Sequence, residues 1–395
     1  MRLARMHDVM AGHVERGEVP GLVTLVNRRG EAHIEAIGVQ ASGRRDPMRR
    51  DTIFRIASMT KPVAAVAAMI LVEECRLRLD EPVDRWLPEL AGRTVLKRLD
   101  GPLDDTVPAK RPLSLRDLLT LRMGLGYVMD AASPYPILKA ANERKLLLGP
   151  PRPQSLAAPD EWIRGVATLP LMYQPGERWM YDVGLDVLGV LIARAAGQPL
   201  EAFLRARLFD PLGMKDTGFN VPAAKIGRLA TSYWTNPERG AVEVFDEARG
   251  GHWSRPPRSR PRPVVWSRPW MTTWPSGRML LNKGRHGRER ILSRASVETM
   301  TTDQLTPEQK AASGLVGGYF DSHGWGFGLS MVTRRDDVAG SVGQFGWDGG
   351  LGTSWRSDPH EDLVAILMTQ RAWTSPSPPD VCRDFWTSTY QVIDD

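Results

Sequence analysis

Cysteine, histidine and long apolar runs are scarce in this sequence, and each scarcity argues against a class of protein. The 395 residues include two cysteines, Cys75 and Cys382, and seven histidines. No Cys-x-x-Cys pair and no His-Glu-x-x-His motif occurs, so the usual patterns of redox and zinc sites are missing. We therefore expect two buried, reduced thiols, no metal and no cofactor.

Segments that would direct the chain to a membrane are also missing. Nowhere do about eighteen uncharged apolar residues run together, the length that a membrane-spanning helix needs. Residues Met1 to Met10 have an amphipathic helical pattern without the apolar centre of a signal peptide. We expect a cytoplasmic protein that does not associate with a membrane.

The sequence has no Gly-x-Ser-x-Gly motif, which disfavours an α/β-hydrolase with a Ser-His-Asp triad. What it has is an ordinary globular composition, with 42% hydrophobic and 25% charged residues. The chain is long enough for one large domain or two.

The net charge of +6 is concentrated in one stretch, where arginines alternate with tryptophans: Arg249, Arg255, Arg258, Arg260, Arg262 and Arg268, with Trp253, Trp266, Trp270 and Trp274. Cations and stacking rings of this kind resemble a platform for single-stranded nucleic acid. Prolines interrupt the same stretch, so no regular face can carry those groups. We expect no nucleic-acid partner.

The most informative stretch runs from Phe54 to Val72 and contains a Ser-x-x-Lys pattern at the start of an apolar run. Pro62 is tolerated only in the first turn of a helix, so a helix is predicted to begin near Ser58. Residues three apart share a helix face, which brings the Lys61 amine beside the Ser58 hydroxyl. Alone, the pattern also fits an N-cap serine followed by a solvated lysine.

The remaining elements suggest one sheet built from both ends of the chain. An N-terminal helix and a hairpin (21–27 and 31–38) are followed by helices from 77 to about 220. One of these helices begins at Ser114, and another, 187–196, is stopped by Gly197. Strands are predicted at 326–332, 340–347, 352–356 and 362–370, with a last helix at 380–393. Short connections between successive strands indicate antiparallel pairing.

Two further places could complete a site with Ser58. Tyr181 falls just before a buried helix, where its phenol could face a cleft, although a lone tyrosine is more often a packed ring. The glycine-rich stretch 346–352 follows a β-rich run, and glycines there let a ligand approach the backbone. A tight turn between strands is the alternative interpretation.

Together these sequence motifs resemble those of the serine β-lactamase and penicillin-binding D,D-peptidase superfamily, in its class C-like branch and closest to the family VIII carboxylesterases. The resemblance rests on 54–62, 79–83, 86–88, 115–120 and 197–217. It implies an α+β, β-lactamase-like fold, with a central antiparallel sheet flanked by helices and an inserted, mostly helical domain. We expect an α/β domain from residues 1–76 and 265–395, and a helical domain with an insertion from 77–264.

The resemblance also implies a site. Ser58 and Lys61 match the family's Ser-x-x-Lys, Tyr181 begins its Tyr-x-Asn, and 347–349 occupy the place of its Lys-Thr-Gly. The Ser58 and Gly350 N–H groups would form the oxyanion hole. The predicted substrate-binding residues are Tyr127, Trp347, Asp348 and Gly349.

Two departures separate this chain from antibiotic-hydrolysing members. Val183 stands where they carry Asn, and Trp347 stands where they carry Lys, so two polar anchors for a β-lactam are missing. Tryptophan at that position resembles the esterase branch. We expect a serine carboxylesterase for short-chain esters, in which Ser58 forms an acyl-enzyme and Lys61 and Tyr181 share the base role, with burial lowering the pKa of Lys61.

Other functions remain open at this point: a β-lactamase or D,D-peptidase-like amide hydrolase, an acyltransferase, or a non-catalytic sensor of the penicillin-binding type. The expected partner is a small ester, and a homodimer is left open.

Residues 257–276 are unlike their surroundings and fit a shifted reading frame of the gene. Read one base earlier, the codons of Trp270-Met271-Thr272 encode Asp-Asp after the first position. The whole stretch 264–276 can then read Gly-Gly-Leu-Val-Ser-Thr-Val-Asp-Asp-Tyr-Leu-Ala-Phe, a pattern that the resemblance implies. If the written residues are real, we expect an irregular, proline-stiffened surface segment in place of a buried helix.

Overall fold

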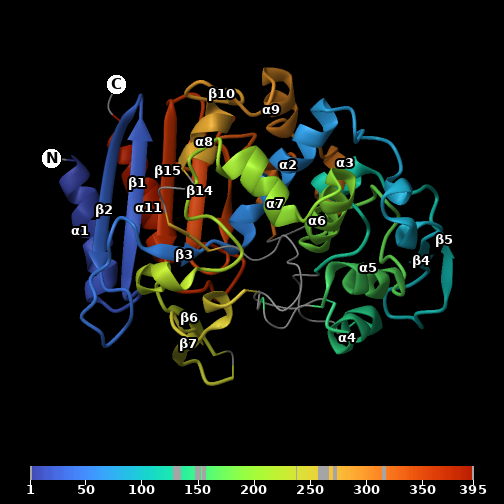
Figure 1. Ribbon diagram of the computed structural model, residues 1–395, viewed down its shortest axis with the longest axis horizontal. Coiled ribbons are helices and arrows are strands. Elements are labelled where there is room, and N and C mark those ends of the chain that lie inside the picture. Colours follow the sequence, from blue (N-terminus) through green and yellow to red (C-terminus); the bar gives the residue numbers. More distant parts are fainter. Residues whose placement is uncertain are drawn as a thin grey trace.

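A seven-stranded antiparallel sheet forms one side of the molecule in the computed structural model (Figure 1). The structure describes residues 2–127, 135–146, 153, 157–236, 238–256, 267–269, 274–313 and 317–393. The strands follow in the order β11 (His323–Trp325), β12 (Ser330–Val332), β13 (Phe345–Gly349), β14 (Thr353–Asp358), β15 (Leu363–Thr369), β1 (Gly21–Arg28) and β2 (Glu31–Gly38).

Strands from the N-terminal and C-terminal parts of the chain pair near one edge of this sheet. β1 pairs antiparallel with β2 on one side and with β15 on the other, with Leu25 opposite Ile366. The prediction of one antiparallel sheet built from both termini is confirmed, and so is the N-terminal hairpin.

Alternation along β15 gives the sheet two apolar faces. Leu363 and Leu367 are buried with Phe385 in a cluster under α1 (Arg2–Glu15) and α11 (Asp380–Gln391). Val364 and Ile366 point to the opposite face and join the main core. Successive strand residues face opposite sides, so both faces must be covered by helices.

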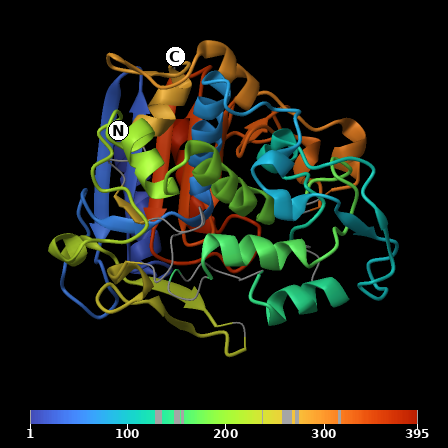
Figure 2. The ribbon, with the colours of Figure 1, turned by 45° about the vertical axis from the view of Figure 1, so that its right-hand side comes forward.

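Helix α2 (Lys61–Glu73) links that second face to the helical half of the molecule. Nearly all of it is buried, and it packs against β13 and against α6 (Val183–Ala196). Helix α8 (Trp274–Leu281) covers β14 and β15. Figure 2 shows the helical half beside the sheet. The first turn of α2 therefore begins at the junction between the two halves.

The helical half contains α6 and several shorter helices. They are α3 (Leu115–Leu119), α4 (Pro136–Glu143), α5 (Pro159–Ala167) and α7 (Leu200–Leu204), which continues as a π-helical turn over Arg205–Phe209. Helices α9 (Arg294–Met300) and α10 (Pro307–Ala311) precede β11. Gly197 ends α6 in the left-handed conformation, at φ +67°, as predicted from its position after the apolar run.

The described residues also form four two-stranded ribbons: β4 (Thr94–Leu96) with β5 (Thr106–Pro108), β3 (Ile53–Arg55) with β8 (Ser267–Pro269), β6 (Ser232–Thr235) with β7 (Val242–Asp246), and β9 (Arg285–His286) with β10 (Glu289–Arg290). Phe245 of β7 packs with Ile53 and Leu351. The predicted domain boundaries at residues 76 and 265 stay a prediction.

Three expectations from the sequence are wrong. Residues 326–329 form the turn between β11 and β12, so the strand predicted from Gly326 begins at Ser330. Cys75 is exposed, whereas Cys382 is buried, and both are free thiols. Cys75 comes directly after α2 has ended, at φ +57°, and so lies outside the buried part of that helix.

The third correction concerns the arginine- and proline-rich segment. Ser267–Pro269 form strand β8, and Trp274 begins helix α8, so these residues are regular and not an irregular surface stretch. Pro275 and Ser276 are buried. Pro275 is compatible with the helix because it stands in the first turn. Residues 257–266 and 270–273 lie outside the described residues.

Two searches among the described residues bear on membranes and metals. No single helix there is long and apolar enough to cross a membrane; the bent pair Val183–Ala196 and Leu200–Phe209 passes by length and composition alone. The described residues also contain no group of three or more His, Cys, Asp or Glu side chains that could hold a metal ion.

Candidate active site

Ser58 lies in a single 3-10 turn, Ala57–Thr60, that runs directly into α2. Ala57 has φ +41°, an uncommon conformation for a residue with a Cβ, and such strain clusters at functional sites. The turn packs closely on β13. A Cβ on Gly349 would lie 2.2 Å from the Ile56 carbonyl oxygen, so only glycine permits this approach.

The Ser58 hydroxyl and the Lys61 amine are within hydrogen-bond distance. Lys61 Nζ donates to Ser58 Oγ at 2.9 Å and to Asp182 Oδ1 at 2.6 Å. The lysine side chain is buried, and its Nζ lies 4.4 Å from the centre of the Tyr181 ring. The sequence predicted the contact between Ser58 and Lys61 but not the contact with Asp182.

The pKa of Lys61 moves in the direction opposite to that expected. Burial acts to lower it, but the Asp182 carboxylate, the negative charge of an ionised Tyr181, the hydrogen bond to Asp182 and the more distant Asp186 together raise the pKa above its ordinary value. An opposite charge within about 4 to 6 Å favours the charged form. Lys61 is therefore an ammonium in the resting site, and the expectation of a lowered pKa is wrong.

Tyr181 enters the site from the segment that leads into α6. Its carbonyl accepts a hydrogen bond from the Tyr127 N–H at 2.9 Å, which ties the two tyrosine segments together. Its phenol oxygen accepts from Trp347 Nε1, also at 2.9 Å. Trp347 is in turn packed edge-on against Trp325, with ring centres 4.6 Å apart. An aromatic wall formed by Trp347 of β13 and Trp325 of β11 thus fixes the phenol.

These groups open onto one cavity of about 760 Å³. Its lining includes six of the eight residues predicted from the sequence: Ser58, Tyr127, Tyr181, Trp347, Asp348 and Gly350. Lys61 lies behind Ser58, and Gly349 faces Ile56 and does not line the cavity. Ser58 and Gly350 line the same space, which is compatible with a shared oxyanion hole.

Asp348 is held by an arginine that the sequence analysis did not single out. Arg356 donates to both carboxylate oxygens of Asp348, each at 2.7 Å, and Ser354 donates to the same carboxylate at 2.5 Å. Burial opposes the charge of Arg356, but Asp348 raises its pKa above the ordinary value. Because Asp348 is already paired, its charge is largely compensated within the cavity wall.

Tyr319 and His323 form another part of the cavity wall. Their rings are stacked, with centres 4.7 Å apart, and the Tyr319 hydroxyl donates to Ser330 Oγ at 2.7 Å. Burial raises the pKa of Tyr319 and lowers that of His323, so both rings are neutral at neutral pH. This part of the wall offers aromatic surface without a net charge.

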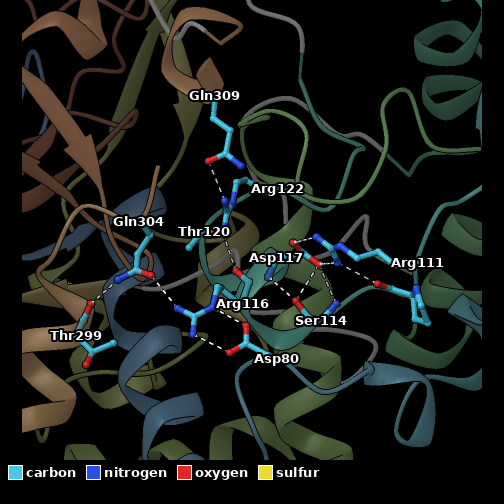
Figure 3. A network of polar contacts seen from close by, with 11 residues as sticks. Asp80, Arg111, Ser114, Arg116, Asp117, Thr120, Arg122, Thr299, Gln304 and Gln309 are labelled. Atoms are coloured by element: carbon cyan, nitrogen blue, oxygen red, sulfur yellow. Dashed lines mark hydrogen bonds and ion pairs between the residues drawn. The ribbon is translucent and has the colours of Figure 1, made fainter. Parts of the chain in front are cut away.

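A polar network around α3, part of which Figure 3 shows, reaches the segment before Tyr181 through Gln309. Arg122 donates to Gln309 of α10, and Gln309 Nε2 donates to the Gly176 carbonyl at 2.6 Å. Arg116 joins α3 to Asp80 and to Gln304. These bonds connect α3, α10 and the tyrosine-bearing segment, and so they position a part of the site from a distance.

Asp182 is the main residue that the sequence analysis missed. An Asp directly before a buried helix indicates an N-cap, and it is indeed the N-cap of α6, but it makes no side-chain cap bond. Its carboxylate lines the cavity and accepts from Lys61 instead. No local sequence signal distinguishes these two orientations.

The comparison with protein families defines the class of this protein. The Beta-lactamase family model matches residues 6–381, and the chain belongs to this family.

Individual proteins of known sequence or structure are similar to nearly the whole chain. Protein Rv1367c of Mycobacterium tuberculosis is 38% identical over 373 residues, covering 90% of this chain and 87% of its own. Esterase EstB of Burkholderia gladioli is 34% identical over 397 residues, covering 95% and 92%. The solved structure of EstCE1, a hydrolase with promiscuous acyltransferase activity, has TM-score 0.77 at 23% identity over 98% of both chains. This likeness agrees with the β-lactamase-like fold.

Proposed function

We propose that this protein is a serine hydrolase that cleaves short-chain carboxylic esters through an acyl-serine intermediate. The observation that carries the proposal is the Ser58 hydroxyl, 2.9 Å from the Lys61 amine at the wall of a cavity that Tyr181 also lines. A nucleophile next to a group that handles its proton is the general sign of covalent catalysis. The similarity to Esterase EstB over 95% of the chain supports the ester as substrate.

In the proposed reaction, Tyr181 works as a phenolate: Ser58 Oγ attacks the ester carbonyl, and the Tyr181 oxygen accepts the serine proton and becomes a neutral phenol. Because Lys61 is already an ammonium and has no free electron pair, the base role moves from the lysine to the Tyr181 phenolate. The Trp347 N–H bond and the Lys61 charge both stabilise negative charge on Tyr181. The Ser58 and Gly350 N–H groups would receive the carbonyl oxygen, and loss of one such donor typically costs about 3 to 4 kcal/mol.

The proton on Tyr181 would then pass to the leaving alcohol, and water would hydrolyse the acyl-serine in the reverse sequence of proton transfers. Lys61 would keep its proton throughout and would hold Ser58 Oγ beside the phenol. Each contact observed around Lys61 has a role in this scheme. After turnover, every described site residue has the same protonation state as before.

Two positions argue against efficient β-lactam hydrolysis. Val183 is buried and apolar, and Trp347 fills its position with an indole whose N–H is already bonded to Tyr181. Neither can supply the amide or ammonium that antibiotic-hydrolysing relatives are expected to carry. When a site lacks the hydrogen-bonding group that a polar substrate needs, its kcat/KM for that substrate can be lower by a large factor. An apolar wall still accepts a short acyl chain.

Acyl transfer is the alternative outcome of the same intermediate. A second cavity of about 380 Å³ shares His323, Asp336, Arg356 and Pro378 with the first and so adjoins it. An alcohol acceptor would occupy this adjoining space. Water and an alcohol would compete for the acyl-serine. A purely sensory role would instead leave the acyl group on Ser58 without turnover.

A series of p-nitrophenyl esters of increasing acyl length, measured beside the chromogenic cephalosporin nitrocefin, tests the proposal. We expect kcat/KM for the butyrate to exceed that for nitrocefin by orders of magnitude, and Ser58→Ala to abolish ester turnover. Added alcohol would reveal transfer by forming a new ester. Comparable kcat/KM for both substrates, or a single stoichiometric release without turnover, would overturn the proposal.

A further inference from the structure

Resting on the proposed function, we propose that Asp182 is a positioning residue that fixes the Lys61 ammonium between Ser58 and Tyr181. The carboxylate does this from the residue directly after the tyrosine. Its role would be to keep both the place and the charge of the ammonium constant while the serine proton moves.

The backbone conformation at Asp182 supports a functional role for this residue. Asp182 has φ +86° and ψ −71°, a conformation that residues with a Cβ rarely adopt. Such conformations persist where the surrounding structure compensates the strain, and they cluster at functional sites. As the N-cap of α6, Asp182 could accept from an N–H of its own helix, but it makes no such bond. The carboxylate is turned toward Lys61 Nζ, 2.6 Å away.

The neighbouring residue Val183 cannot take the place of Asp182 as the partner of Lys61. It occupies the third position of the tyrosine motif, where antibiotic-hydrolysing members of the family are expected to carry Asn, but its isopropyl group is buried and can accept no hydrogen bond. The acceptor therefore comes from the middle position of the motif. Asp182 lines the cavity and is only partly exposed, so the ion pair is shielded from water on most sides.

The charges around Lys61 show why this one carboxylate matters. Tyr181, Asp182 and Asp186 face it from the segment that includes α6, and Ser58 faces it from the 3-10 turn. Asp348 of β13 is the acid on the adjoining sheet, where Arg356 of β14 holds it: both bonds between the two measure 2.7 Å. Asp182 is thus the acid that contacts the ammonium directly.

The sign of the expected effect follows from these contacts. Asp182 raises the pKa of Lys61, whereas burial lowers it. Removing the carboxylate charge therefore lowers the pKa of Lys61 and lets the ammonium lose its proton at a less alkaline pH. If the ammonium is the working form, activity must then fall at alkaline pH.

The experiment measures kcat and KM for p-nitrophenyl butyrate from about pH 6 to about pH 10, a range in which a lysine titrates only if its pKa lies below the ordinary value of about 10.4. Four proteins are compared: wild type, Asp182→Asn, Asp182→Glu and Asp186→Asn. Ser58→Ala supplies the rate of spontaneous ester hydrolysis. The rate of Ser58 labelling by a fluorophosphonate is recorded over the same range, because it reports the nucleophile without requiring ester turnover.

We expect the wild-type profile to stay level at alkaline pH. In Asp182→Asn, kcat should fall at least about tenfold while KM changes less than about threefold, since the lost interaction acts in the chemical step. Its activity should also decline above about pH 8, as the lysine loses its proton. Asp182→Glu should restore the level alkaline profile, and Asp186→Asn should shift it less than Asp182→Asn does.

Opposite results would overturn the inference. Higher neutral-pH activity in Asp182→Asn, or a wild-type rate that rises steadily with pH, would show that neutral Lys61 is the working base. A lower thermal midpoint with an unchanged pH profile would assign Asp182 a structural role only. The wild-type profile needs no variant, so it decides the matter even if Asp182→Asn does not fold. Absence of ester turnover with intact, pH-dependent labelling would refute the proposed substrate and leave the role of Asp182 standing.

Discussion

At the scale of single residues, the account depends on three side chains that act as one unit. Ser58→Ala, Lys61→Ala and Tyr181→Phe should each lower kcat by at least about a thousandfold without loss of folding, because each removes one part of the same proton-transfer arrangement. The double variants should lose little more than the single ones. The measurement is kcat with p-nitrophenyl butyrate, with circular dichroism as the folding control. Multiplicative losses would contradict a concerted unit.

The Trp347 indole offers a finer test at the same scale. Trp347→Phe keeps an aromatic ring but removes the N–H that donates to Tyr181 at 2.9 Å, so we expect kcat to fall about tenfold, the worth of one hydrogen bond to a charged group. Trp325→Phe is the matched control. Its indole N–H is buried without a hydrogen-bond partner among the described residues, so the same change breaks no bond. Equal losses in both variants would assign Trp347 a packing role.

Local spacing predicted the serine and lysine, whereas tertiary contacts decided the charge. Ser58 and Lys61 are three residues apart at a helix start, so their contact follows from helix geometry alone. The raised pKa of Lys61 depends on Asp182, whose orientation requires φ +86° and a neighbour more than a hundred positions away in the sequence. A sequence pattern can propose a cap for such a residue but cannot show that its side chain turns away from the helix.

At the scale of elements, short α3 is stabilised mainly by its cap. Asp117 is buried and accepts from the Ser114 N–H and hydroxyl at 2.9 and 2.8 Å, and from Arg111 (Figure 3). Asp117→Ala should lower the free energy of unfolding by about 2 to 3 kcal/mol, since it breaks a capping box and leaves the buried Ser114 N–H and hydroxyl without their acceptor. Urea denaturation measures the change.

The control for this prediction is Asp100→Ala, which removes an acid from the exposed pair with Arg98. Exposed pairs of this kind contribute little because water screens them. Its denaturation midpoint should match the wild type. An Asp117→Ala protein as stable as this control would show that the cap is not what holds α3.

Helices with apolar runs and caps were predicted well from the sequence, whereas a glycine-containing turn was mistaken for a strand. Apolar runs, caps and the Gly197 stop identified α2, α3 and α6. The predicted strand from Gly326 failed because Gly328 adopts φ +68° in a turn, where its N–H bonds to the Leu119 carbonyl. A glycine-containing apolar run fits either a strand or a buried turn, and only packing decides between them.

At the scale of the whole molecule, the predicted sheet from both termini is confirmed because alternating apolar strands at each end had to share one core. The segment 257–276 is the exception to this agreement between local and global pattern. If its frame is shifted in the gene record, the true chain would carry fewer arginines and two more aspartates there, and the net charge of +6 would fall to about zero.

Intact mass and peptide mapping of the purified protein test that prediction. We expect no peptide with the printed sequence around Arg260 and Arg262, and a mass that differs from that of the printed sequence. A peptide that contains Arg260 and Arg262 in the printed sequence would show that this sequence is real and that the basic cluster is part of the protein.

The central claim is that Ser58 carries the acyl group, and one measurement tests it most directly. The protein is mixed with excess p-nitrophenyl butyrate, quenched in acid during turnover, and digested for mass spectrometry. The account predicts one butyryl group on the peptide that contains Ser58, absent from Ser58→Ala and lost when turnover is allowed to finish. A butyryl group on another residue, or continued turnover by Ser58→Ala, would contradict it.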